Sequence, residues 1–468
     1  MVANRKIVAL MAVSISAAGC AGSLGAMPPP VPLLEAYPGP DTEGTRRPGG
    51  TARADTVELT GVVTLPQALS AALLGSPDIA AFSWEVRAAE AQAIQEGLYF
   101  NPELEVEIEE FGGNKNRGGF STAQTTLRLS QVVDLSGVVA RRRRLAEHDA
   151  RLAGWEYRLA RLDVFARTAQ FFIDVAAAQR RLELARENLR LAQKVTEAVG
   201  ARVEAGKVSP LNLTRSRVLL SRSRLEAVRA EAAFDASRTR LAATWGQHRA
   251  TFERVEARLD APGVLPALEQ LLLAAEESPV VAARRAEIAR QDASVGLESA
   301  RAIPALRLSA GLQRFEDNGE LAAVVGLGMD LPLFDRNQGA IERARSLLEA
   351  ARERSRSALV EVKAAVVEGF RRLQTLKQTI ASFDERIIPA ARRVFDAANE
   401  AYRSGKLGIL DLLDARRTLV ELKTERLRAL ADFYKEQARI EVMLGRPLAG
   451  ETTEKQQAGH VKGLEVTR

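Results

Sequence analysis

The sequence GKVSPLNL at residues 206–213 returns as GKLGILDL at residues 405–412. In both copies the glycine follows a long run of helix-forming residues, and a second such run begins a few residues later. Glycine favours the left-handed conformation that ends many helices. Each copy therefore predicts a tight turn at which one long helix ends and another returns alongside it.

The helices on either side of the first turn are predicted to be unusually long. Residues 137–205 contain no proline and almost no glycine, and a further helix is expected over about 210–245. Apolar residues follow one another at steps of three and four, which predicts a coiled-coil seam; they are Leu152, Trp155, Leu159, Leu162, Ala166, Ala169, Ile173 and Ala176. At about 1.5 Å per residue, such a helix reaches on the order of 100 Å. In the second copy, Pro389 is expected to kink the long helix.

Other pairs of segments show that the repeat covers most of the chain. LPQAL at 65–69 matches LPALE at 265–269, and SPDIAA at 76–81 matches SPVVAA at 278–283. We therefore predict a tandem duplication, with one unit at 61–246 and the second at 247–446. Each unit is expected to contain a helix, two strands, a long helix, a tight turn and a returning helix.

The strands are predicted from alternation of apolar and polar residues. They fall at about 103–111 and 122–133 in the first unit, and at about 305–315 and 321–331 in the second. Each pair is joined by a segment rich in Gly and Asn, so each is a hairpin. Hairpins of this length suit a membrane β-barrel, although a half-buried sheet in a soluble domain would alternate in the same way. Four strands cannot close a barrel, so several chains would have to pool their strands.

Composition argues against several classes of function. The 66 basic and 60 acidic residues leave a net charge of +6, which gives no reason to expect a nucleic-acid partner. The three histidines are scattered and have no cysteine near them, so no metal site is predicted. No catalytic constellation is present. We expect a protein that is not an enzyme and has no cofactor.

The N-terminus predicts export. Residues 1–19 read as a signal peptide that ends in Ala-Ala-Gly, directly before Cys20, the one cysteine of the chain. Small residues before a cysteine suit lipoprotein processing, which would leave a covalent lipid such as palmitate on Cys20; an ordinary signal peptide with an incidental cysteine is the alternative. Residues 20–60 are rich in Pro and Gly and are expected to form a flexible tether. Residues 447–468 are expected to form a polar tail.

Three segments carry a resemblance to a known family. They are AQAIQEGLYFNP at 91–102, MDLPLFD at 329–335 and YRSGKLGILDLLDAR at 402–416. Together with the duplication, they resemble the TolC family of outer-membrane efflux proteins, and within it the CzcC-like heavy-metal branch. The resemblance implies a homotrimer in which an α-helical periplasmic tunnel joins a shared outer-membrane β-barrel with four strands per chain. It also places the protein in the outer membrane of a Gram-negative bacterium.

The resemblance further implies a passive exit channel of a tripartite system. An inner-membrane resistance-nodulation-division pump and a periplasmic adaptor protein would deliver the cargo, either heavy-metal cations such as cobalt, zinc or cadmium, or drugs. Two alternatives remain open at this point. One is a structural or adaptor coiled-coil lipoprotein of the periplasm, and the other is the exit duct of a type I protein secretion system.

The resemblance also assigns roles to the two turns. Asp411 and Asp414, three positions apart, match the carboxylates that line the family's periplasmic aperture, although acids in a first turn can simply cap a helix. Tyr402 keeps the family's tip aromatic, with Asn212 where an acidic partner is expected and Leu407 where a basic residue is expected. The adaptor-docking tips would be formed by Gly206, Lys207, Val208 and Ser209 in the first copy, and by Gly405, Lys406, Leu407 and Gly408 in the second.

Overall fold

The computed structural model describes residues 58–257, 259 and 262–448. The predicted signal peptide, Cys20, nearly all of the predicted tether and the tail beyond residue 448 lie outside the described residues. Leu59, at the start of the described part, already packs against the core. None of the helices in the described ranges is long and apolar enough to cross a membrane.

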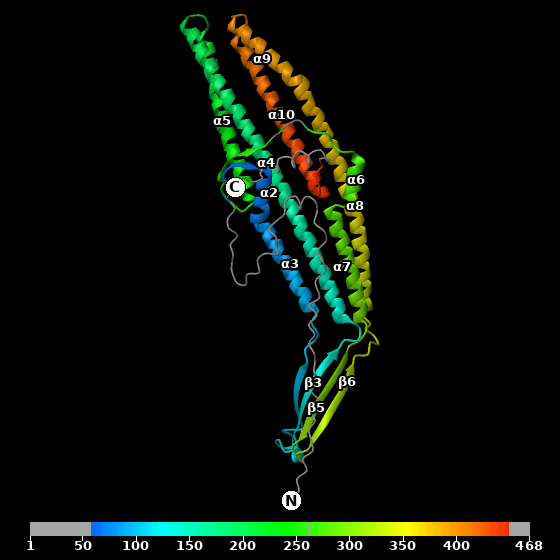
Figure 1. Cartoon of the computed structure of the whole chain (residues 1–468). Helices are drawn as coiled ribbons and strands as arrows, with labels where there is room; N and C mark the ends of the chain where they lie inside the picture. The colour runs from blue at the N-terminus through cyan, green and yellow to red at the C-terminus, as the bar shows by residue number, and fades with distance from the viewer. Residues whose placement is uncertain (1–57, 258, 260–261, 449–468) are drawn as a thin grey trace, which may run out of the picture.

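The two halves of the chain repeat the same order of elements (Figure 1). The first half contains β1 (Gly61–Thr64), α2 (Leu65–Gly75), α3 (Pro77–Glu96), β2 (Glu103–Glu109), a short 3₁₀ turn (Lys115–Arg117), β3 (Gln124–Val133), α4 (Val138–Glu204) and α5 (Pro210–Ala243). The second half contains β4 (Phe252–Glu256), α6 (Leu268–Glu276), α7 (Pro279–Arg301), β5 (Leu306–Phe315), β6 (Leu321–Met329), α8 (Gln338–Ser382), a π-helical turn (Phe383–Ile387), α9 (Ile388–Arg403) and α10 (Ile409–Leu444).

The start of each unit differs from the prediction. Each unit opens with a short strand and two helices instead of one helix, and the strands β1 and β4 pair in parallel with each other. The break between the two helices falls at Ser76 and Ser278, both extended and both followed by proline. The residue before a proline is sterically pushed out of the helical conformation, so these two positions end one helix and begin the next.

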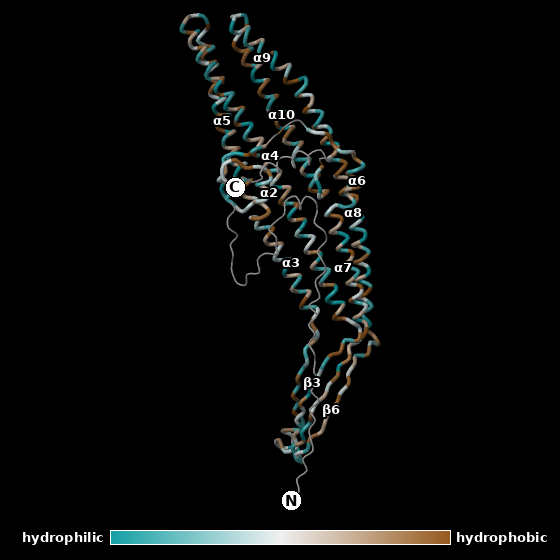
Figure 2. The backbone as a smooth tube through the Cα atoms, in the orientation of Figure 1, coloured by the Kyte–Doolittle hydropathy of each residue, from teal (hydrophilic) through white to brown (hydrophobic). Residues whose placement is uncertain are grey.

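The predicted hairpins are confirmed, with strand ends within two residues of the expected positions. They join into one antiparallel sheet with the order β2-β3-β5-β6, in which Leu127 lies opposite both Val106 and Leu312. Many large apolar residues of this sheet are exposed, among them Val325 and Leu327. Figure 2 shows hydrophobic and hydrophilic positions interspersed along its strands. The strands β2 and β6 are open edges, and unpaired edges call for further strands.

The helix α4 is more deeply buried than a single coiled-coil seam requires. The predicted seam residues Leu162, Ala169 and Ile173 are buried, but so are Val164 and Phe172, which lie outside that seam. The reason is that α4 is central and packs against α2, α3, α5, α7 and α10. Helices on several sides bury several faces of α4, which a single apolar repeat does not predict.

The predicted break at Pro389 takes the form of a π-helical turn just before it. Proline has no N–H to donate to the preceding turn, and a π turn is one way in which a helix accommodates this loss. The chain remains helical through the turn but changes direction between α8 and α9 (Figure 1).

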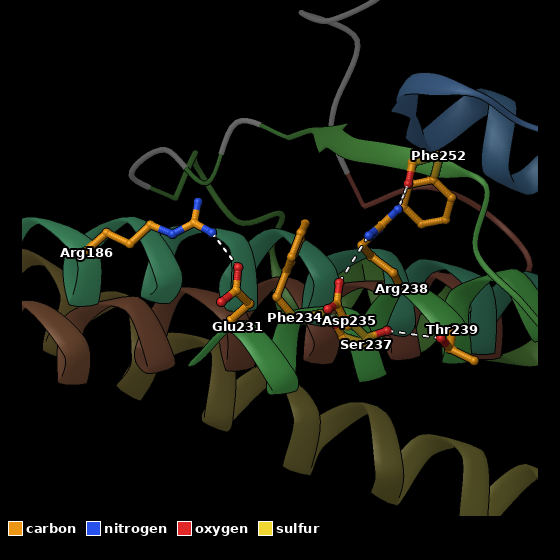
Figure 3. A network of polar contacts seen from close by, with 8 residues as sticks. All are labelled: Arg186, Glu231, Phe234, Asp235, Ser237, Arg238, Thr239 and Phe252. Atoms are coloured by element: carbon orange, nitrogen blue, oxygen red, sulfur yellow. Dashed lines mark hydrogen bonds and ion pairs between the residues drawn. The ribbon is translucent and has the colours of Figure 1, made fainter. Parts of the chain in front are cut away.

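A polar joint fixes the helical hairpin α4–α5 to the strand β4 (Figure 3). Arg238 donates to the carbonyl oxygen of Phe252, pairs with Asp235 at 3.1 Å, and lies over the rings of Phe234 and Phe252. Further along α5, Glu231 pairs with Arg186 of α4 at 2.7 Å. These contacts hold the base of the hairpin, and its tip lies at the same end of the molecule as the turn between α9 and α10 (Figure 1).

Candidate functional site at the helical tips

Both predicted turns end their helices in the same way. Gly206 and Gly405 have φ values of +67° and +77°. The amide of Lys207 donates to the carbonyl of Arg202 at 2.8 Å, and the amide of Lys406 donates to that of Ala401 at 2.8 Å. These bonds, each between residues five positions apart, satisfy carbonyls that the ending helix leaves without partners. The repeated glycine and lysine thus build two similar tips.

The returning helices begin differently. In the first copy, the Ser209 hydroxyl accepts a hydrogen bond from the Leu211 amide, and Pro210 occupies the first turn of α5. The two preceding loop residues are Lys207, which is exposed, and Val208, which is half-buried. In the second copy Gly408 takes the capping position and has no side chain to offer. The first turn of α10 instead contains Asp411, whose carboxylate lies close to Gly408.

A small apolar cluster joins the two hairpins near their tips. Val199 of α4 is buried against Ala398 of α9 and against Ile409 and Leu412 of α10, with the half-buried Leu407 and Tyr402 beside them. The turn between α9 and α10 is therefore packed against the first hairpin. The predicted docking residue Leu407 contributes to this packing.

Arg202 makes a contact that the sequence did not predict. Its guanidinium lies 4.6 Å from the centre of the Tyr402 ring and donates to the carbonyl oxygens of Tyr402 and Arg403, both at 3.4 Å. A cation is favourable here because it meets an aromatic face and the negative end of a helix at once. The available signal was an arginine in the last turn of α4 and a tyrosine in the last turn of α9.

Asn212, the residue at the position where an acidic partner is expected, lies in the first turn of α5. Asn212 is half-buried, and its backbone amide donates to the carbonyl of Ser209 at 2.9 Å, which closes the first turn of α5. Within the described part of one chain, the ring of Tyr402 contacts Arg202.

The two candidate aperture carboxylates are exposed in the single chain. Asp414 lies 3.8 Å from Arg417, which also lies 3.4 Å from Glu421. Asp411 and Asp414 share one face of α10, as predicted from their spacing. Exposed carboxylates on a helix face can meet their counterparts from other copies. Within the described part of the chain itself, no group of three metal-ligating side chains was found.

A buried arginine lies one helical turn below them. Arg416 of α10 is 7% exposed and donates to both the carbonyl and the side-chain oxygen of Asn188 on α4. Burial lowers the pKa of its guanidinium, and the charge of Glu187 acts in the opposite direction. The contact lies at a groove of about 750 Å³ between α4, α5 and α10. Arg416 thus ties the two hairpins together below the tips.

Comparison with known proteins identifies the family. The model of the family "Outer membrane efflux protein" matches residues 68–247 and 271–446, one match in each half of the chain. The chain belongs to the outer membrane efflux protein family. The paired matches confirm the tandem duplication.

Two curated relatives illustrate the similarity. The cobalt-zinc-cadmium resistance protein CzcC of Cupriavidus metallidurans is 30% identical over 419 residues, which cover 89% of this chain and 99% of CzcC. The nickel-cobalt-cadmium resistance protein NccC of Alcaligenes xylosoxydans xylosoxydans is 31% identical, over 64% of this chain and 67% of NccC.

Solved structures show the same fold at lower identity. CusC matches with a TM-score of 0.70 at 18% identity, over 83% of this chain and 94% of that chain. VceC of Vibrio cholerae matches with a TM-score of 0.68 at 20% identity, over 82% of this chain and 97% of that chain. The predicted architecture is confirmed: a helical tunnel joined to a barrel to which each chain adds four strands. The protein is an outer-membrane efflux channel subunit and not an enzyme.

Proposed function

We propose that this channel is the exit duct for heavy-metal cations such as cobalt, zinc or cadmium. The observation that carries the proposal is the similarity to CzcC, which extends over 99% of that protein. NccC and the nickel and cobalt resistance protein CnrC of Cupriavidus metallidurans support the same cargo class. The duct would be passive, with a resistance-nodulation-division pump and an adaptor protein delivering the ions.

The assembly we propose is a homotrimer anchored by lipid on Cys20. The open edges β2 and β6 support pooling of strands between copies, since each chain supplies four strands. The two tips, with their similar glycine-lysine turns, would dock the adaptor. Asp411 and Asp414 would ring the tunnel entrance at the tips, and Arg202 with Tyr402 would hold the second hairpin against the first.

A second cargo class has a specific observation in its favour. The pyoverdine export protein OpmQ of Pseudomonas putida is 24% identical over 78% of this chain and 82% of OpmQ. An organic compound or drug is therefore the alternative cargo. Family membership favours the channel over the structural or adaptor lipoprotein, and a type I secretion duct remains a less supported alternative.

Metal tolerance tests the cargo. The gene would be deleted in a strain that retains its pump and adaptor, and then restored on a plasmid. We expect deletion to lower tolerance to zinc, cobalt and cadmium several-fold and to raise the metal retained by the cells, measured by inductively coupled plasma mass spectrometry. Unchanged metal tolerance together with lowered tolerance to organic compounds would instead identify the second cargo class.

A further inference from the structure

Four segments of the chain join the sheet to the helices at one level of the molecule (Figure 1). Two lead into strands, from α3 into β2 and from α7 into β5, and two lead out of strands, from β3 into α4 and from β6 into α8. The ends of β3, β5 and β6 are level, because Val133 pairs with Leu306 and Leu306 pairs with Met329. We call this band the collar; it consists of residues 97–102, 134–137, 302–305 and 330–337.

The collar exposes large apolar side chains at each of its four joins. Every one of these side chains is at least 45% exposed, and Phe334 reaches 91%; they are Leu98, Tyr99, Phe100, Leu135, Ile303, Leu331, Leu333 and Phe334. Aromatic residues beside a membrane-spanning segment usually lie at the boundary between the hydrocarbon and the head groups. The composition of the collar is therefore that of a membrane interface.

The collar also continues an apolar face of the sheet. Val325, Leu327 and Met329 occupy alternate positions of β6 and are exposed. Alternate residues of a strand share one face, and Leu331 and Leu333 extend the same spacing beyond the end of β6. In an outer-membrane barrel such an apolar face meets lipid. The collar thus lies where the lipid-facing surface of the sheet ends.

The start of α4 adds positive charge beside the collar, with four consecutive arginines at 141–144. Two of them are engaged within the chain. Arg142 lies 3.8 Å from Glu96 and over the ring of Phe100 at 5.0 Å, and Arg143 pairs with Glu147 at 2.9 Å. These two arginines tie the helix to the collar and to its own next turn.

The other two arginines face outward. Arg141 and Arg144 are exposed and lie on the side of α4 opposite the buried Val139 and Ala146. Among the described residues, no ion pair joins Arg141 or Arg144 to an acidic group. The nearby carboxylate of Asp134 already accepts hydrogen bonds from the first amides of α4. Two guanidinium groups at the rim of the collar are therefore open to an anion from outside the chain.

Their height along α4 matches the layer of lipid head groups. Arg141 and Arg144 come three and six residues after the helix begins, which is about 5 Å and 9 Å along its axis. The head-group layer is roughly 5–8 Å thick on each side of the hydrocarbon, and a long arginine side chain adds reach. Arg151, the next exposed arginine on this face, lies about 10 Å beyond Arg144, more than a Debye length of about 8 Å.

We propose that Arg141 and Arg144 bind the phosphate of an anionic phospholipid in the periplasmic leaflet of the outer membrane. A lipid fits better than a dissolved anion, because the arginines adjoin exposed apolar side chains that continue a lipid-facing sheet. Guanidinium groups suit phosphate because their fork of donors can engage two oxygens at once. The bound lipid would help to hold the depth of the channel in the membrane.

The preference for negative charge is assigned to the α4 join alone. At the β6–α8 join, Asp330 and Asp335 accompany Arg336, so no positive excess is present there. The remaining joins contribute apolar contact. Basic residues close to a membrane surface attract anionic lipids, and the attraction fades within a Debye length. The effect should therefore depend on Arg141 and Arg144 and on salt.

Full-length protein in lipid nanodiscs tests the proposal. The probes are spin-labelled phosphatidylglycerol and spin-labelled phosphatidylcholine, and electron paramagnetic resonance measures the fraction of each that the protein holds. We expect wild type to prefer phosphatidylglycerol and Arg141→Gln/Arg144→Gln to lose most of this preference, since each basic residue near the surface contributes a factor of about five. Arg141→Lys/Arg144→Lys keeps the charge and should keep most of the preference.

The matched control is Arg151→Gln/Arg190→Gln, which removes two exposed arginines of α4 further from the collar. It should leave the preference unchanged, and single-channel conductance shows that each variant is folded. The single variants Arg141→Gln and Arg144→Gln, each with a partial loss, serve if the double variant forms no channels. An equal loss in the control, or an undiminished preference in the Arg141 and Arg144 variants, overturns the proposal.

A fluorescence measurement tests the position of the collar independently. Phe334→Trp adds a tryptophan at the most exposed collar position, and wild type with its three tryptophans is the reference. We expect lipids brominated close to their head groups to quench a larger fraction of the fluorescence in the variant. Equal quenching in variant and wild type would show that the collar lies outside the membrane, and the proposal would fall.

Discussion

Two kinds of charged residue lie at the tips, and their settings differ. Arg202 is fixed by an aromatic ring and two carbonyl oxygens. Asp411 and Asp414 are exposed on one face of α10, with Arg417 as the basic neighbour of Asp414. Fixed charges hold a structure together, whereas exposed carboxylates are free to act on passing ions.

Replacing both carboxylates should change ion selectivity. In a trimer the variant Asp411→Ala/Asp414→Ala removes six carboxylates from the entrance, so cation preference and block by divalent cations should both weaken in planar bilayers. Thermal stability should change little, because surface substitutions without buried partners usually cost less than about 0.5 kcal/mol. Glu349→Ala, an exposed carboxylate on α8, is the control. Unchanged selectivity with easier unfolding would show that the two aspartates only cap α10.

Removing the Arg202 guanidinium should loosen the tip. A cation–π contact contributes on the order of 1 kcal/mol, so Arg202→Ala should raise the open probability of single channels a few-fold. Arg202→Lys keeps the charge but loses the planar stacking group, and we expect an intermediate effect. Arg190→Ala, an exposed position on α4, is the control. Equal open probabilities in all three variants would contradict a holding role for Arg202.

At the scale of elements, the join between β3 and α4 is built by one side chain. Asp134 accepts hydrogen bonds from the amides of Val138 and Val139 at 3.0 Å and 2.9 Å, and from the amide and hydroxyl of Ser136 at 3.1 Å. Burial acts to raise the pKa of this carboxyl, but these bonds outweigh it and hold the pKa below the ordinary value. The long helix α4 therefore starts where Asp134 satisfies its first amides.

Asp134→Ala should lower the free energy of unfolding by about 1 kcal/mol, the usual cost of losing an N-terminal cap. A depressed folded-state pKa adds stability above the unfolded-state value near 3.9 and loses it as the pH falls through the folded value. The difference in the free energy of unfolding between wild type and variant should therefore have its full size at pH 7 and shrink below about pH 4. Thermal unfolding by circular dichroism in detergent measures it. A gap that does not depend on pH would contradict the ionic cap.

At the scale of the whole molecule, one chain is an incomplete channel. Its sheet has two open edges, and its helices α5 and α9 expose large apolar residues. In the trimer proposed above, further copies of the same chain would cover both kinds of open surface.

The purified protein should therefore need detergent and form a trimer with a single pore. Light scattering corrected for detergent gives the mass, and electron microscopy gives the symmetry. Replacing exposed apolar residues of the strands by charge, as in Val325→Arg/Leu327→Arg, should prevent membrane insertion, because charge on a lipid-facing position costs roughly 2–4 kcal/mol each. A monodisperse monomer that needs no detergent would contradict the assembly.

Much of this protein is determined by local patterns that the sequence displays directly. The repeat, the four strands, the long helices and the two glycine turns follow from alternation, helix-forming composition and backbone conformation, each of which acts over a few neighbouring residues. For that reason the strand ends were predicted to within two residues and both tip turns were located.

Contacts between distant segments were decided only by the tertiary structure. The pairing of β1 with β4, the burial of several faces of α4, the contact of Arg202 with Tyr402 and the burial of Arg416 beside Asn188 each join residues far apart in the chain. An arginine in a helix has the same local sequence signal whether it faces water or a neighbouring hairpin. Only the packing of the two hairpins decides which partner it meets, because that packing depends on all the helices together.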